Sequence, residues 1–472
     1  MADSAARSVA PAAASAGRLS IASKLAFGAG DLSPGMAAII VGFFQALFLT
    51  TVAGMSPGAV GAILLLGRVW DAITDPWMGL ISDRTRSRLG RRRIWMLIGA
   101  VPFGLLYFLL WFSPPFGDVG KFLYYLVVIL FFNTAYTVVN VPYTSLTAEL
   151  TSDYDERTSL NSFRFAFSIG GSLVAGIIHG ILITRFCADA NACLPEESRA
   201  GYMLSAAIFG VIMVLPFVWC VAGTRERYTP PANSTASASI ISQLKVAVGN
   251  KPFLFVIGIY LCSWMALQIT QNVIGFYLTF YLRRADLFPL VLLAVQGSAM
   301  VFLFVWSAAS RKIGKQNTYY AGMIFWILVQ SGLFFLPDDQ AMLAVGLAAL
   351  AGVGIATAYL VPWSMLPDVI DLDELNTGER REGVFYGVMT FTQKTCVGLG
   401  IALTLQSLQW YGFDGSLLPG SQPESALTAL RWMIGPLPTV ILLAGIVLVY
   451  RYPLTKQRHA EILAELARRK AA

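Results

Sequence analysis

The chain has 472 residues, of which 56% are hydrophobic and only 13% are charged, and it contains 42 glycines. Together with a mean hydropathy of +0.64, this composition excludes an ordinary soluble domain and is typical of a membrane protein. The net charge of +7 comes from basic loops between apolar runs, so it does not indicate binding to nucleic acid.

Twelve apolar runs are long enough to cross the ~30 Å hydrocarbon core of a bilayer. They form two sets of six, separated by a break at 224–250 that is rich in Pro, Ser and charge. The runs cover 26–52, 58–82, 94–113, 121–146, 164–184, 202–223, 252–282, 288–309, 318–337, 341–366, 384–410 and 431–450. We therefore predict an all-α membrane protein with six transmembrane helices in each of two domains, 21–223 and 251–451.

Basic residues gather in alternate loops. The loop after the second run, DRTRSRLGRRR, holds six arginines in eleven residues, and the loop after the eighth run begins RKIGK. The positive-inside rule then places these loops, the linker 224–250 and both termini in the cytoplasm. We predict a multi-pass protein of the plasma (inner) membrane, with a disordered cytoplasmic tail at 1–20, rich in Ala and Ser, and a second cytoplasmic tail at 452–472.

Two aspartates, Asp71 and Asp75, interrupt the second apolar run. At this spacing both carboxylates lie on one face of a helix, one turn apart. Each ionised carboxylate at the centre of a membrane helix costs about 2.5–3.5 kcal/mol, and the two also repel one another. A bound cation would offset both costs, and we favour this reading. The alternative is a pair neutralised by buried basic residues, with Arg68 one turn before Asp71 as the nearest partner.

Lys394 is a lone basic residue near the middle of the eleventh run, 384–410. Such a lysine predicts a functional group, with a partner in the other domain at Asp31, Asp71 or Asp75. The alternative is a lysine whose ammonium snorkels to the membrane interface.

Other motifs are few. Cys187 and Cys193 share the outer loop CADANAC, where they could form a local disulfide if that loop faces an oxidising compartment. We find no P-loop, which argues against pumping driven by nucleotide hydrolysis. We expect no enzymatic activity and no cofactor beyond a coupling cation.

The basic loops also form an internal repeat, because Gly79–Arg84 with Gly90–Arg93 and the later Arg311–Lys315 occupy matching positions in the two sets. Two like halves of this kind are the arrangement of the major facilitator superfamily. The segment WDAITDPWMGLISDRTRSRLGRRR resembles the signature of the glycoside–pentoside–hexuronide:cation symporters within that superfamily. Three further stretches are similar to that family: KLAFGAGD at 24–31, VPYTSLTAEL with DERTSLNSFR at 141–164, and PDVIDLDELNTGERREGVFYG at 367–387.

The resemblance implies a cation site and a coupled transport function. It assigns the coupling cation to Asp71 and Asp75, with Thr74 between them and Thr137 from the fourth helix. Such oxygen ligands suit Na⁺, and also Li⁺ or H⁺. The expected function is cation-coupled symport of a small organic solute by alternating access, in a monomer whose partners are the solute and the bilayer. A channel and a non-transporting sensor are the other classes considered.

The resemblance also implies substrate residues, at Asp31, Arg164 and Lys394. Where sugar-transporting members carry an aspartate and an aromatic residue on the fourth helix, this chain has Asn140 and Thr144. The stretch YLVPWSMLPDVID and the outer SQPE look similar to eukaryotic sodium-dependent lysophosphatidylcholine symporters. The resemblance to the glycoside–pentoside–hexuronide family makes a sugar, glycoside or uronide the expected solute, and the second resemblance makes a lysophospholipid the alternative.

Charged residues at the cytoplasmic ends of the helices are candidates for a gate. An acidic loop near the end of the tenth run is expected to pair with the basic inner loops, or else to be simply solvated. The candidate gating residues are Asp83, Arg84, Arg91, Asp368, Asp371 and Arg380.

Overall fold

The computed structural model describes residues 19–151, 154–189, 191, 193, 195–227, 248–379 and 381–471. Twelve helical segments within these residues are long and apolar enough to cross a membrane. A bilayer offers no water to backbone amides, so a spanning segment has to satisfy them internally, as a helix does. The predicted class is confirmed: the chain is an all-helical, multi-pass membrane protein. Most of the predicted tail at 1–20 and most of the linker lie outside the described residues.

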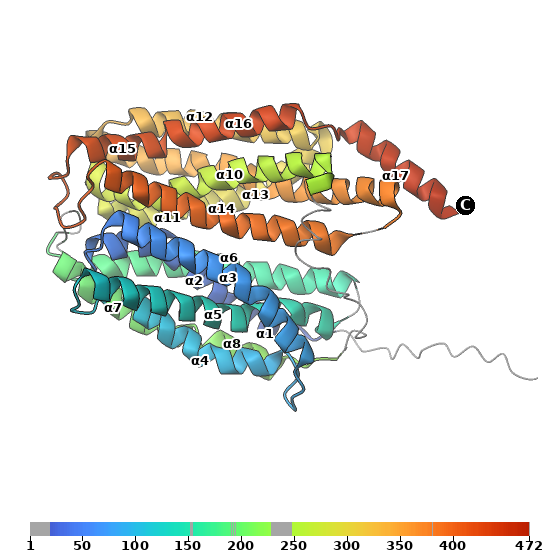
Figure 1. The fold of residues 1–472 in the computed structure, drawn as a ribbon, viewed down its shortest axis with the longest axis horizontal. Helices are drawn as coiled ribbons and strands as arrows, with labels where there is room; N and C mark the ends of the chain where they lie inside the picture. Colours follow the sequence, from blue (N-terminus) through green and yellow to red (C-terminus); the bar gives the residue numbers. More distant parts are fainter. Residues whose placement is uncertain are drawn as a thin grey trace, which may run out of the picture.

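The first six spans form the lower half of the molecule in Figure 1, which we call the first half. α1 and α2 together make one span, as do α7 and α8. The helices are α1 (Ile21–Ala29), α2 (Leu32–Thr51), α3 (Pro57–Arg84), α4 (Arg93–Leu110), α5 (Asp118–Leu150), α6 (Tyr154–Thr184), α7 (Pro195–Ile212) and α8 (Leu215–Gly223).

The remaining six spans form the second half, which is uppermost in Figure 1. Its first helix begins with a side-chain cap, since Asn250 accepts a hydrogen bond from the backbone N–H of Phe253 at 3.1 Å. The helices are α10 (Lys251–Phe276) with a π-helical continuation (Tyr277–Tyr281), α11 (Phe288–Ile313), α12 (Lys315–Phe335), α13 (Ala341–Thr377), α14 (Glu382–Trp410), α15 (Glu424–Ile434) and α16 (Pro436–Tyr450), with short 3₁₀ turns at Ala285–Leu287 and Asp338–Gln340.

Helix α13 is longer than its apolar run. The run ends near residue 366, and the acidic residues after it are predicted as a loop, yet the helix continues to Thr377. That expectation is wrong because helical hydrogen bonding does not stop where apolar residues stop. The last turns bury Asp368 and Asp373, and basic residues of the same half pair with both.

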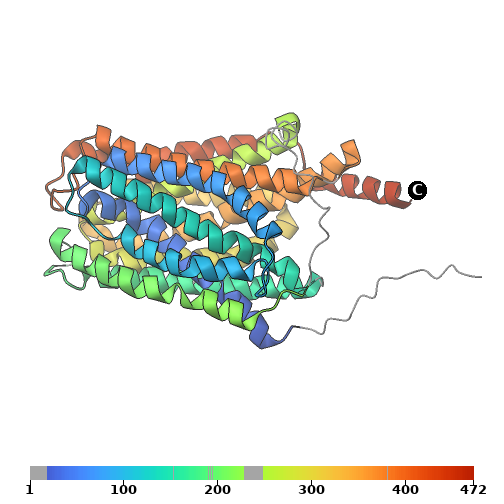
Figure 2. The same cartoon turned by 60° about the horizontal axis from the view of Figure 1, so that its bottom comes forward.

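The predicted C-terminal tail contains one further helix, α17 (Lys456–Ala471), which projects beyond the bundle in Figure 2. Its apolar side chains Ile462 and Leu466 are buried. Arg469 donates a hydrogen bond to the carbonyl of Leu375 at 2.8 Å, and α17 thereby contacts the end of α13. The helix is therefore packed on the second half.

The molecule has two ends, which we name by their loops. The disulfide end carries the loop of Cys187 and Cys193, and the basic end carries the loop 85–92 and α17. The two halves meet along α3 and α14, α6 and α11, and α2 and α10. Toward the disulfide end of the α3–α14 seam, a Cβ atom on Gly61 would lie 3.2 Å from the Cα of Ala402. Only glycine allows backbones to approach so closely, so the halves are tightly apposed there.

Candidate functional site

A cavity of about 610 Å³ lies between the two halves. This volume lies within the roughly 300–1,000 Å³ of small-molecule sites. Helices α2, α3, α5 and α6 line it from the first half, and α10, α11, α12, α13 and α14 line it from the second. Its walls are mostly apolar, with neutral polar side chains contributed by Gln45, Asn133, Asn140, Gln268, Gln271, Asn272, Gln296 and Gln393, among others.

A compact polar cluster lies on the first-half wall of this cavity. Asp71 and Asp75 project from α3, and the hydroxyl of Thr137 on α5 donates toward both: 3.1 Å to Asp71 Oδ1 and 2.8 Å to Asp75 Oδ1. Thr74 Oγ1 lies 3.5 Å from Thr137 Oγ1 and donates to the backbone carbonyl of Asp71 at 3.3 Å. The four residues expected to bind a cation are therefore neighbours, although Thr74 contacts no carboxylate oxygen directly.

Lys394 completes the cluster from the opposite half. Its Nζ lies 2.9 Å from Asp71 Oδ2 and also forms an ion pair with Asp75 Oδ2. The lysine thus pairs with two of its three predicted partners and does not snorkel to an interface. One ammonium balances only one of the two carboxylates, so the cluster keeps an unmatched negative charge when both are ionised.

Arg68, the partner of Asp71 in the alternative interpretation, does not pair with it. It forms no ion pair or hydrogen bond with the residues that the structure describes, although it lines the cavity. Both oxygens of Asp71 are already engaged, one by Thr137 and the other by Lys394. The neutralising base in this structure is therefore Lys394.

The remaining predicted substrate residues occupy two different settings. Asn140 lines the cavity. Asp31 and Arg164 instead pair with one another, Arg164 Nε donating to Asp31 Oδ2 at 3.0 Å, and neither is among the cavity-lining residues. The Arg164 guanidinium also lies 5.6 Å from the ring centre of Tyr143. This pairing was not foreseen from the sequence, because the two residues are 133 positions apart.

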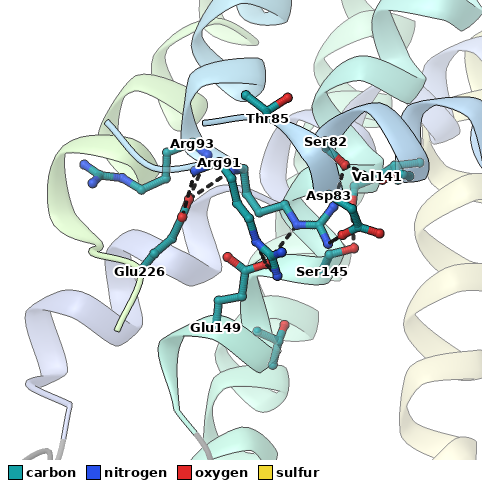
Figure 3. Close-up of polar contacts among 12 residues, drawn as sticks. Ser82, Asp83, Thr85, Arg91, Arg93, Val141, Ser145, Glu149 and Glu226 are labelled. Carbon is teal, nitrogen blue, oxygen red and sulfur yellow. Dashed lines mark hydrogen bonds and ion pairs between the residues drawn. The ribbon is translucent and has the colours of Figure 1, made fainter. Parts of the chain in front are cut away.

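The candidate gating residues of the first half form a network at the basic end (Figure 3). Asp83 pairs with Arg92, and Arg91 pairs with Glu149 at 2.7 Å. The hydrogen bond to Glu149 raises the pKa of Arg91 above its usual value, so this guanidinium stays charged. Arg84 is exposed. Glu149 is 1% exposed and belongs to this network, although it is not among the residues predicted from the sequence.

Glu226, which follows α8 in the sequence, binds the same loop (Figure 3). Its carboxylate accepts hydrogen bonds from the backbone N–H groups of Arg91, Arg92 and Arg93 at 2.8, 2.9 and 3.1 Å. These amides begin α4, and a carboxylate at a helix N-terminus is favoured both by the free N–H groups and by the helix dipole. The chain leaving α8 is thereby attached to the start of α4.

The candidate gating residues of the second half pair among themselves. Lys315 lies 2.7 Å from both oxygens of Asp368, and His459 Nε2 lies 3.1 Å from Asp371 Oδ2. Asp373 is bound by Arg381 at 2.8 Å. The acidic segment thus pairs with a basic inner loop of its own half and is not simply solvated. Within the described ranges, neither the first-half network of ion pairs nor this second-half network bridges the two halves. Arg380 lies outside the described residues.

The two outer cysteines are joined. Cys187 and Cys193 form a disulfide with a Cα–Cα distance of 5.1 Å, which is the local bond that the sequence suggested for this loop. Cys220, Cys262 and Cys396 remain free thiols.

Two six-span halves around a central cavity, with carboxylates inside a spanning helix, define the major facilitator class of transporter. A family model described as "MFS/sugar transport protein" matches residues 26–456. The chain belongs to this family, and it is a transporter of the major facilitator superfamily.

Relatives that match along nearly the whole chain include the following three. An uncharacterized symporter of Synechocystis is 39% identical, covering 96% of this chain and 98% of its own. The sodium-dependent lysophosphatidylcholine symporter 1 of Xenopus tropicalis is 29% identical, covering 94% and 89%. The Escherichia coli protein YagG, whose name suggests glycoside/cation symport, is 28% identical and covers 96% of each chain.

The fold is also similar to solved transporter structures. A bacterial homolog of the human lysosomal transporter Spinster superposes with a TM-score of 0.67 at 12% identity, covering 94% of this chain and 97% of its own. At this identity the likeness supports the major facilitator fold and carries no argument about the solute.

Proposed function

We propose that this protein is a Na⁺-coupled symporter of a small glycoside or uronide, working by alternating access in the plasma (inner) membrane. The observation that carries the proposal is the pair Asp71 and Asp75, which share one hydroxyl and one ammonium beside a cavity of about 610 Å³. A purely structural ion pair would not need two carboxylates for one lysine.

The cation ligands in this proposal are the oxygens of Asp71, Asp75 and Thr137, with Thr74 supporting Thr137. Hard oxygen donors of this kind suit Na⁺ or Li⁺, and the carboxylates could equally accept a proton. An entering cation binds carboxylate oxygens that now contact the ammonium of Lys394. Because the site lies on α3 and α5, binding fixes these two helices relative to one another.

Lys394 gives a physical route from the cation to the solute. It reaches from α14 of the second half to the α3 carboxylates of the first. A cation at those carboxylates competes with the ammonium and frees Lys394 to turn toward the cavity, which it also lines. Since the coupling is a thermodynamic linkage, a solute that binds the freed lysine raises the cation affinity by the same factor.

The pattern of contacts supports alternating access, with the basic end facing the cytoplasm. At the disulfide end the halves are joined by hydrogen bonds from Gly58 N–H to Gln409 Oε1 at 2.6 Å and from Asp286 N–H to Asn191 Oδ1 at 3.3 Å. At the basic end the described ion pairs stay within each half. We infer an inward-facing state in which the halves are closed toward the outside.

A lysophospholipid is the second candidate solute. The specific observation in its favour is the cavity wall, where apolar side chains from both halves outnumber polar ones. Such a wall suits an acyl chain better than it suits a sugar alone. A relative that is 29% identical carries lysophosphatidylcholine symport in its name, which adds to this alternative.

The test is uptake into proteoliposomes from the wild-type protein and from Asp71→Asn and Asp75→Asn. Uptake of a panel of glycosides, uronides and lysolipids is measured with Na⁺, Li⁺ or proton gradients. We expect gradient-driven accumulation by the wild type and none by either variant, because each substitution removes a carboxylate from the cation site. Asp118→Asn, an exposed acidic residue at the disulfide end, is the matched control. Unchanged Na⁺-driven uptake in both site variants would show that the pair is structural.

A further inference from the structure

One basic side chain that lines the cavity, Arg68, has no partner for its charge among the described residues. Four charged residues line it, namely Arg68, Asp71, Asp75 and Lys394. The last three are bound to one another. Arg68 is left over, without an ion pair or hydrogen bond to any residue that the structure describes. A guanidinium in a membrane span is costly to leave unpaired, so such residues face a cavity or a partner.

The place of Arg68 is set by the α3–α14 seam. A Cβ atom on Gly398 would lie 3.1 Å from Arg68 Cβ and 3.4 Å from its Cγ, so the stem of the arginine packs against a helix surface kept free by glycine. Gly398 is one turn from Lys394 on α14, and Arg68 is one turn from Asp71 on α3. Arg68 is therefore held beside the carboxylate cluster, yet Thr137 and Lys394 already occupy both oxygens of Asp71.

The balance of charge suggests what would bind there. With both carboxylates ionised, the two acids and two bases that line the cavity cancel. A monovalent coupling cation then adds one uncompensated positive charge near the middle of the membrane. A solute that brings one negative charge restores the balance, and its anionic oxygens match the fork of an arginine, which binds carboxylates and phosphates through paired hydrogen bonds.

We propose that Arg68 binds an anionic group of the transported solute, either a carboxylate or a phosphodiester. The inference rests on the proposed symport and narrows its solute: a uronide is favoured over a neutral glycoside, and an anionic lysolipid over a neutral one. The rest of the solute lies against the apolar wall and the cavity amides, and the cation and the solute balance each other's charge within the cavity.

Binding to the purified protein tests this with matched probes, measured by calorimetry in Na⁺. One pair is para-nitrophenyl glucuronide and para-nitrophenyl glucoside; the other is lauroyl lysophosphatidylglycerol and monolaurin. We expect the wild type to bind one of the anionic probes about tenfold or more tightly than its neutral partner. The pair that shows the preference identifies the source of the anion, a carboxylate on a sugar or a phosphodiester on a lipid.

The variants place the preference at Arg68. Arg68→Gln should abolish it, and Arg68→Lys should keep part of it, because lysine retains the charge but loses the fork. Arg88→Gln makes the same change at an exposed arginine of the basic end that does not line the cavity, and it should leave the preference intact. Equal affinity of the wild type for charged and neutral probes in both pairs, or an unchanged preference in Arg68→Gln, would overturn the proposal.

Proteoliposome uptake separates this inference from the symport on which it rests. Na⁺-driven uptake of the neutral glucoside, equal in the wild type and in Arg68→Gln, would keep the symport and remove the anion site. An anion preference that depends on Arg68 without any cation-driven uptake would do the reverse. Preference for the anion together with its Na⁺-driven accumulation, both lost in Arg68→Gln, supports the two together.

Discussion

At the scale of single residues, the central feature is the sharing of Thr137 between two carboxylates. One hydroxyl carries one proton, so it can donate fully to only one oxygen at a time. The contacts at 3.1 and 2.8 Å therefore describe a group poised between two acceptors. A cation between the carboxylates would take over that role, with the hydroxyl oxygen turned toward it as a ligand.

Thr137→Val tests this arrangement, since valine keeps the shape and removes the hydroxyl. A hydrogen bond to a charged group contributes about 1.5–3 kcal/mol, and about 1.4 kcal/mol is a factor of ten in affinity. We expect the Na⁺ concentration for half-maximal uptake to rise about tenfold or more. The measurement is solute uptake into proteoliposomes over a series of Na⁺ concentrations.

Thr134→Val is the control on the same helix. The hydroxyl of Thr134 bonds to the Leu130 carbonyl at 2.8 Å and to Trp70 Nε1 at 2.9 Å, away from the carboxylates. Its Na⁺ dependence should match that of the wild type. If both valine variants shift the Na⁺ dependence equally, Thr137 is not a ligand.

The sequence could predict these residues only in part. Asp71 and Asp75 are recognisable because a four-residue spacing fixes a common helix face, whatever the tertiary structure. The partners of Lys394 could not be selected in this way. Lys394 lies 319 positions from Asp75 in the sequence, and nothing local distinguishes the partners among the three acidic candidates. The same holds for Arg68: its pairing with Asp71, the alternative interpretation, does not occur because residues from two other helices occupy the carboxylate.

At the scale of helices, hydropathy predicted the twelve spans well, since the length of a span is set by the membrane itself. It missed what lies beyond the apolar region, where polar helical turns look like loops. The end of α13 and the whole of α17 are examples, because ion pairs and a few buried side chains hold them in place.

The α3–α14 seam gives a prediction about conformation. Gly61→Leu cannot fit against Ala402 and Leu405 in this state, where even a Cβ would lie 3.2–3.4 Å from them. Overpacking costs about 1–3 kcal/mol, which shifts a two-state equilibrium roughly 5- to 150-fold. We expect the variant to favour the conformer that is open at the disulfide end.

The readout is labelling of a cysteine at cavity residue Gln393 by an impermeant maleimide applied from the disulfide end, in a protein without its free cysteines. Gly61→Leu should label faster. Gly346→Leu, where a Cβ meets nothing within 4 Å, should label like the parent protein. Equal rates in all three would mean that the seam does not control access.

At the scale of the whole molecule, two independent features predict the same orientation. Basic loops at one end favour the cytoplasm, and a disulfide at the other end favours an oxidising compartment. We expect Asp118→Cys at the disulfide end to be labelled from outside intact cells, and Arg88→Cys at the basic end to be labelled only after permeabilisation. Both side chains are exposed. Labelling of both from the same side would refute the topology.

The cancelling charges of the cavity have an electrical consequence. A membrane potential does work of about 2.3 kcal/mol per elementary charge per 100 mV. With both carboxylates ionised, the charges of the four charged residues that line the cavity sum to zero. The membrane potential therefore does little work on them when the empty carrier returns. A neutral solute moving with one Na⁺ would be drawn into a negative cell by voltage as well as by concentration. A monoanionic solute moving with one Na⁺ would cross electrically silent, and only the two concentration gradients would set how far it accumulates.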